Sequence, residues 1–187
     1  MRKLRTTVLA GTALALLIVL AAALPATAAG TTVPDPRDVR GKLDLKEVRR
    51  SGNERLTWRM ITYERWRVPD IWSVGSLVVD FDTRGDERPD YYVLIEPTHT
   101  NMKARLFRDR RQKDDYEIGK LKAWRKDQKS ASFQLPFRRV IVGDGRTTYS
   151  WRAQTLFNGN GRCSQVCFDL APQSEAWVVE PLPGVEL

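Results

Sequence analysis

The sequence predicts an all-β domain, an antiparallel two-sheet β-sandwich of the jelly-roll type, preceded by a signal peptide. Apolar and polar residues alternate with a period of two in at least seven segments, and turn-forming residues separate them. Helical periodicity is nearly absent from the same region. Two packed sheets are the usual arrangement for antiparallel strands in a domain of this size.

The expected strands are short and evenly distributed. They cover residues 42–46, 55–60, 76–81, 91–96, 102–106, 132–137 and 149–157. The run Tyr91–Glu96 is almost continuously apolar, which is typical of a central strand covered on both faces. Residues 110–128 lack a clean helical stripe, and we interpret them as a hairpin with Gly119 at a bulge. Residues 138–142, after Pro136, fit an edge strand or a short turn.

The N-terminus has the pattern of an export signal. Three cations (Arg2, Lys3 and Arg5) precede the continuously apolar run Leu14–Leu24, and small residues surround a cleavage site after Ala28. An uncleaved membrane anchor is the alternative, since the uncharged span is long enough to cross a bilayer. The predicted division is a signal peptide at 1–28, a linker at 29–40, a β-domain at 41–172 and an irregular tail at 173–187.

Composition limits the expected partners. The chain of 187 residues has a formal charge of +8, and loss of the signal peptide leaves about +5. Basic residues are mixed with aromatic ones in the run 103–129, but acidic residues interrupt the charge and export makes nucleic acid an unexpected partner. We expect a secreted, extracellular protein with no membrane contact after cleavage. Anionic cell-envelope polymers are the expected polyanionic partners.

Two cysteines, Cys163 and Cys167, lie four positions apart. In an exported protein this pair is expected to form a disulfide that closes a small loop. No histidine is nearby to complete a metal site, and no local feature would activate a thiolate.

An acidic turn joins two of the predicted strands. Four aspartates surround Gly85 within eleven residues, and an oxygen-rich loop of this kind can bind calcium. Arg84 and Tyr91 occupy positions where a calcium loop needs oxygen ligands, so a polar hairpin turn with Gly85 at positive φ is the alternative. Asp80 is expected to point outward. The candidate ligands are Asp80, Asp82, Asp86 and Asp90, with calcium as the one possible cofactor.

The order of features resembles a known family. The segments are GKLDLKEV (41–48), RLTWRMIT (55–62), SLVVDFDTRGDERPDYYVLI (76–95), MKARLFR (102–108), an F-x-L-P-F strand (133–137), the cysteine pair and DLAP (169–172). Together they resemble secreted actinobacterial β-sandwich proteins that are similar to DOMON domains and to family-nine carbohydrate-binding modules. The resemblance implies a fold used by sugar-binding and haem-binding relatives. Arg84 and the pair Glu87-Arg88 depart from its usual acidic turn.

Tryptophans are the candidate sugar-stacking residues. Trp58 and Trp151 alternate into the predicted core. Trp66, Trp72 and Trp124 lie in polar or irregular segments and are the candidate ligand-binding platforms, with capping of the core edge as the alternative role.

The sequence offers little for catalysis. His99 is the only histidine, it lies in a predicted turn, and no Gly-x-Ser-x-Gly motif is present. The same turn position disfavours His99 as a haem ligand. We therefore expect a secreted non-catalytic β-sandwich domain that binds carbohydrate or another cell-surface polymer. The alternatives are a structural extracellular domain without a small ligand and, more distantly, a hydrolytic enzyme.

Overall fold

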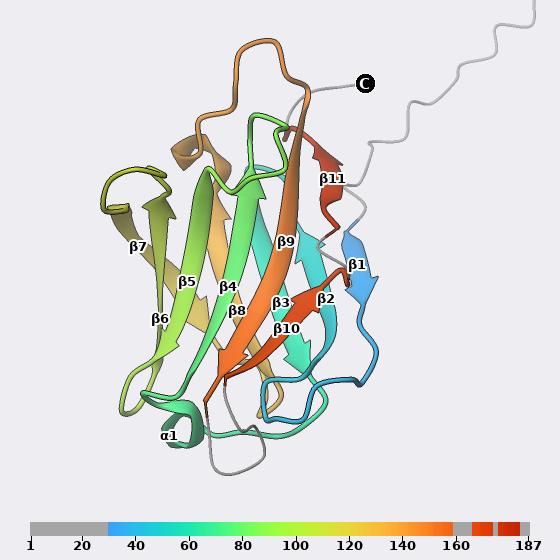
Figure 1. Ribbon diagram of the computed structural model, residues 1–187, viewed down its shortest axis with the longest axis vertical. Coiled ribbons are helices and arrows are strands. Elements are labelled where there is room, and N and C mark those ends of the chain that lie inside the picture. Colours follow the sequence, from blue (N-terminus) through green and yellow to red (C-terminus); the bar gives the residue numbers. More distant parts are fainter. Residues whose placement is uncertain (1–29, 159–165, 174–175, 184–187) are drawn as a thin grey trace, which may run out of the picture.

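A computed structural model describes residues 30–158, 166–173 and 176–183 of the chain (Figure 1). The expected signal peptide at 1–28 and Cys163 lie outside these residues, so the signal and the disulfide stay predictions. In the described part the fold is all-β, with one short helix, α1 (Val68–Ile71), and a 3-10 turn at Phe137–Arg139. The strands are β1 (Thr31–Pro34), β2 (Leu45–Ser51), β3 (Arg55–Thr62), β4 (Gly75–Asp82), β5 (Tyr91–Pro97), β6 (Met102–Arg108), β7 (Tyr116–Trp124), β8 (Ser130–Pro136), β9 (Thr148–Phe157), β10 (Cys167–Ala171) and β11 (Val178–Pro181).

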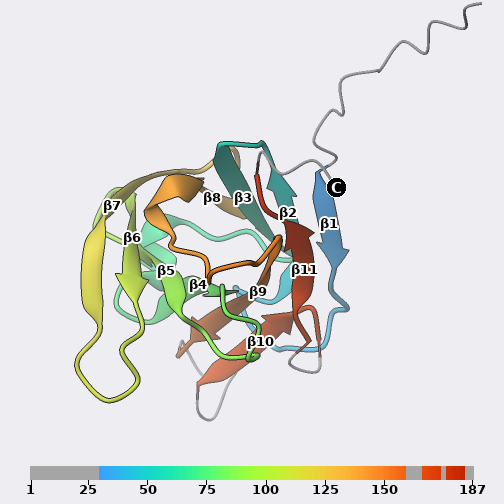
Figure 2. The ribbon, with the colours of Figure 1, turned by 90° about the horizontal axis from the view of Figure 1, so that it is seen from above.

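All strand pairs are antiparallel and belong to one sheet that nearly closes on itself. The strand order is β1-β2-β3-β8-β7-β6-β5-β4-β9-β10, and β11 pairs with β9 outside this path. Figure 2 shows the strands arranged around a ring, with β7 on one side and β1 and β11 on the other. The seam of the ring lies between β1 and β10, the two ends of the path, and there β10 contacts β2.

The predicted two separate sheets are not confirmed, because strand β7 pairs with strands of both halves and joins them into one sheet. Its first part pairs with β6, from Tyr116 to Leu121, and its last three residues pair with β8. The register between β6 and β7 shifts between Leu106 and Phe107, so that Leu106 faces Gly119 and Phe107 faces Glu117. The predicted bulge near Gly119 is therefore confirmed. A bulge bends its strand, and here β7 passes from one half of the sheet to the other.

The core fills the inside of the ring. Trp58 is fully buried there; its ring stacks on Phe133 at 5.3 Å and meets Phe81 and Trp151 edge-on at 5.1 Å and 6.2 Å. The core positions predicted for Trp58 and Trp151 are confirmed. Along β3 the buried and partly exposed residues alternate, as the period-two pattern predicts.

Several boundaries differ from the prediction. The expected linker contributes strand β1, which pairs with β2, and the expected irregular tail contributes β11, which pairs with β9. Both segments are short and rich in proline, and backbone pairing across the chain overrides their weak local signal. Residues 110–128 contain a single strand and not a complete hairpin. Residues 138–142 follow the turn alternative. Within the described residues, no helix has the length and apolar character needed to span a membrane.

Candidate functional site

The predicted acidic turn is a hairpin connection between β4 and β5. Asp82 organises it: its Oδ1 accepts hydrogen bonds from the backbone N–H groups of Arg84 (2.9 Å) and Gly85 (2.5 Å), and its Oδ2 accepts one from Glu87 (2.8 Å). Gly85 has a φ of +74°, as expected for the turn. The carboxylate of Asp82 thus satisfies turn amides, which is the role of aspartate in a polar turn.

The other three aspartates of this segment also have protein partners. Asp90 accepts hydrogen bonds from the backbone and hydroxyl of Thr83, both at 2.9 Å, and Asp86 pairs with Arg111 at 2.8 Å. Asp80 lies on the outer face, opposite the core residue Phe81, as alternation predicts, but it is buried there: Arg152 and Gln154 on the adjacent β9 donate to its Oδ2 at 3.1 Å and 3.0 Å. The turn therefore directs its carboxylates toward separate amides and cations.

The three candidate aromatic platforms have different surroundings. Trp66 is only 1% exposed, its Nε1 donates to Thr62, and the Arg125 guanidinium covers its ring at 3.5 Å. The expectation of an exposed platform is wrong for Trp66, because the loop after β3 folds inward at this ring. Trp72 is 45% exposed and lies against His99 with ring centroids 4.0 Å apart. Trp124, at the end of β7, is half-buried.

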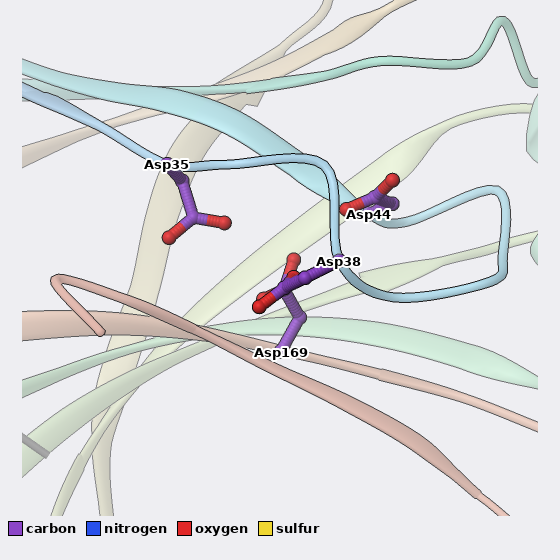
Figure 3. Close-up of side chains that lie close together, drawn as sticks. All are labelled: Asp35, Asp38, Asp44 and Asp169. Carbon is purple, nitrogen blue, oxygen red and sulfur yellow. The ribbon is translucent and has the colours of Figure 1, made fainter. Parts of the chain in front are cut away.

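A different group of carboxylates comes together at the seam of the ring. One oxygen from each of four aspartates lies within 4.8 Å of the others, in the only such group of three or more potential metal ligands among the described residues. Three of the residues lie between β1 and β2, and the fourth belongs to β10 (Figure 3). The group, which we call the seam cluster, consists of Asp35, Asp38, Asp44 and Asp169.

The seam cluster is buried except at Asp38. Asp35, Asp44 and Asp169 are 4%, 2% and 3% exposed. Figure 3 shows Asp169 rising from β10 toward the segment that bears the other three. Asp38 is on the surface and leaves the group open to solvent on one side.

Hydrogen bonding satisfies only part of the seam cluster. Asp169 accepts from the backbone N–H groups of Leu45 (2.6 Å) and Leu170 (2.9 Å). Neither carboxylate oxygen of Asp35 has a hydrogen-bond partner in the described structure, and Oδ1 of Asp44 has none. Arg37, with its Nε 3.8 Å from Asp44, is the only cationic side chain of the described residues within 4.0 Å of these carboxylates. The seam cluster therefore holds more negative charge in a buried position than Arg37, its neighbouring cation, can neutralise.

Burial and mutual repulsion change the proton affinity of this group. Burial, followed by the charge of Asp169, raises the pKa of Asp35 to about 8. Burial likewise raises the pKa of Asp169 to about 6 and raises that of Asp44. Without a compensating cation, these three buried carboxylates resist being ionised together.

The seam cluster was not among the sites predicted from the sequence. Its members lie in the expected linker, at the start of the domain and in DLAP, and Asp169 is separated from Asp35 by more than a hundred positions. The local signal was the spacing of three aspartates in D-P-R-D-V-R-G-K-L-D at 35–44. The fourth member, Asp169, could be placed there only from the tertiary position of β10.

A second region is the outer face of the sheet over β1, β2, β3, β8 and β7. Directly opposite residues of an antiparallel sheet lie on the same face. One row of such residues crosses all five strands, and each member lies directly opposite the next on the neighbouring strand. The members, in order, are Thr32, Arg49, Arg59, Ser132 and Trp124. These residues line a hollow of about 270 Å³, together with Lys126. We call this region the outer row.

The outer row has an unusual charge pattern. Arg49 and Arg59 face each other directly, an arrangement that normally costs stability. Each is offset by one acid, Arg49 by Glu47 at 2.6 Å and Arg59 by Asp127 at 2.5 Å. Lys122 also contributes a cation, with its Nζ 5.5 Å from the centre of the Trp124 ring. The outer row and its neighbours thus contain four cations (these three and Lys126), two acids and one aromatic ring.

No protein-family model, curated protein or solved structure matches this chain. The resemblance to DOMON-like and family-nine carbohydrate-binding domains therefore stays an expectation from the sequence.

Proposed function

We propose that the protein is an exported, non-catalytic β-domain that binds an anionic cell-surface polysaccharide along the outer row. The observation behind this proposal is the row of hydroxyl, guanidinium and aromatic side chains across five strands, in which Thr32, Arg49, Arg59 and Trp124 reach the surface and Ser132 is buried beneath them. Arginines bind carboxylate, phosphate or sulfate groups, hydroxyls bind sugar hydroxyls, and an aromatic face packs on the apolar face of a sugar ring.

An extended ligand fits this surface better than a compact one. The row crosses five strands, and strands in a sheet are spaced about 4.8 Å apart, so its length approaches 20 Å. A polymer can contact several positions at once along such a row. Negative groups on the polymer would compete with Glu47 and Asp127 for the two arginines, so binding should depend strongly on salt.

The test compares anionic polymers of different chemistry with a neutral polysaccharide. Purified protein is titrated with polygalacturonate, teichoic acid and a neutral glucan at low and physiological ionic strength. We expect binding to the anionic polymers that weakens as salt rises, and a loss of about tenfold or more in affinity for Trp124→Ala and for Arg59→Gln. Trp72→Ala is the matched control because it removes an exposed tryptophan that does not line the hollow of the outer row.

The outcomes separate the alternatives. Salt-independent binding to the neutral glucan alone would contradict the role of the arginines. Equal loss with Trp72→Ala and Trp124→Ala would contradict the location. If no polysaccharide or peptidoglycan fragment binds, the protein is better described as a structural extracellular domain without a ligand.

A further inference from the structure

We infer that the seam cluster is a binding site for one divalent cation of the calcium type. The proposal is independent of polysaccharide binding, which concerns another face of the molecule. Its ligands are carboxylate oxygens of Asp35, Asp38, Asp44 and Asp169.

The donor set selects the class of ion. All four ligands are hard carboxylate oxygens, and no histidine or cysteine belongs to the group. Such sets favour calcium or magnesium over zinc and copper, which prefer nitrogen or sulfur. Four aspartates supply more negative charge than one divalent cation neutralises, and Arg37 next to Asp44 offsets part of the remainder.

The coordination requirements favour calcium over magnesium. The four oxygens lie within 4.8 Å of one another, which is compatible with shared coordination of one ion with bonds of about 2.4 Å. Magnesium demands a near-ideal octahedron of ligands, which four carboxylates from separate segments are not built to supply. Calcium also accepts six to eight ligands in irregular arrangements, and solvent at exposed Asp38 can supply the rest.

The second observation is the orphaned carboxylate of Asp35. This side chain is 4% exposed, and neither of its oxygens has a hydrogen-bond partner among the described residues. Buried charges in proteins are paired or coordinate metals, because an isolated one is costly. Both of its near neighbours, Asp169 and Asp44, are acids and cannot pair with its ionised form (Figure 3).

The location gives the ion a mechanical role. Asp169 belongs to β10, at one end of the sheet path, and the other three ligands belong to the segment that joins β1 to β2 at the opposite end. The described hydrogen bond from Leu45 to Asp169 already crosses this seam. A cation held by all four carboxylates joins the two ends of the nearly closed sheet.

The experiment uses purified protein freed of metal with a chelator. Calcium chloride is titrated by calorimetry, and the melting temperature is followed with calcium, magnesium or neither. We expect one calcium site, with affinity in the submillimolar to millimolar range of extracellular modules, and a melting temperature that rises with calcium concentration and much less with magnesium.

Two variants distinguish calcium binding at the seam cluster from calcium binding at the acidic turn. Asp35→Asn keeps the shape of the side chain but removes its carboxylate ligand from the seam cluster. It should lose the calcium-dependent rise in melting temperature. Asp86→Asn, in the turn between β4 and β5, should keep the full calcium response.

The inference is overturned if the wild-type protein shows neither heat nor a change in melting temperature at millimolar calcium. It is also overturned if Asp35→Asn retains the wild-type response, or if Asp86→Asn loses it, which would place the ion in the turn. A calcium-insensitive wild-type protein that Asp35→Asn destabilises would show that protonated aspartates fill the cluster.

Discussion

The backbone N–H of Leu45 donates a hydrogen bond of 2.6 Å to Oδ2 of Asp169, across 124 positions of the sequence. Leu45 is the first residue of β2, and Asp169 is the middle residue of β10. This bond joins strands that have no ladder between them in the sheet path. It therefore shows that the seam of the ring is held by a side chain where regular pairing stops.

Replacing Asp169 by alanine should destabilise the seam in metal-free protein. The change leaves the buried N–H of Leu45 without its acceptor, which costs about 1–3 kcal/mol of unfolding free energy. Urea denaturation in the presence of a chelator measures this loss. The control is Asp86→Ala, which removes a surface ion pair and should cost less than about 1 kcal/mol. Equal losses in the two variants would contradict the role given to the Leu45 bond.

Gly85→Ala should destabilise the turn between β4 and β5 by more than about 1 kcal/mol. Gly85 has a φ of +74°, and an added Cβ would lie 2.1 Å from Nη1 of Arg146. Gly145→Ala is a matched control, since Gly145 has a φ of +73° but an added Cβ would meet no atom within 4 Å. The difference between the two unfolding free energies isolates the contact with Arg146. Identical values would mean that Arg146 moves aside without cost.

Trp66 and Trp72 should differ sharply in their contribution to stability. Trp66→Ala removes a fully buried ring under Arg125, and changes of this kind cost about 3–5 kcal/mol. Trp72→Ala removes a side chain that is 45% exposed and should cost less than about 1 kcal/mol. Denaturant unfolding of both variants checks the contrast. A small effect of Trp66→Ala would contradict the buried position found for this ring.

Asp70 should make stability depend on pH in the acid range. A hydrogen bond from the backbone N–H of Arg67, together with Lys42 at 3.1 Å, holds the pKa of Asp70 well below its usual range. A lowered pKa stabilises the folded state above the unfolded value of about 3.9, and this contribution is lost as the pH falls toward the folded value. The melting temperature of Asp70→Asn should therefore fall less than that of the wild-type protein between about pH 5 and pH 2. Parallel curves for the two proteins would contradict this assignment.

The strands were largely predictable because their evidence is local. Alternation along Leu56, Trp58 and Met60 requires only that one face of the strand be buried, and the structure confirms it. The turn around Gly85 was predictable for the same reason, since aspartate and glycine are typical of polar hairpin turns. β1 and β11 were missed because they are short, proline-containing edge segments that are stabilised by their partners and not by their own residues.

The sites were less predictable than the strands. Trp66 and Trp72 lie six positions apart in one irregular segment, yet one is buried and the other exposed. The polar neighbours of Trp66 in the sequence indicated exposure, but Arg125, far along the chain, covers the ring. Of the three predicted platforms, only Trp124 lies on the outer row, because the register of β7 with β8 carries it there.

The sequence alone established an all-β domain and the position of its acidic turn, through periodicity, turn chemistry and composition. These are properties of neighbouring residues, and local backbone preferences and burial of one strand face decide them. Tertiary structure decided that the sheet nearly closes, that Arg49 and Arg59 face each other, and that Asp169 meets Asp35, Asp38 and Asp44. These relations depend on strand register and on the closure of the seam, which bring together residues that no local pattern connects.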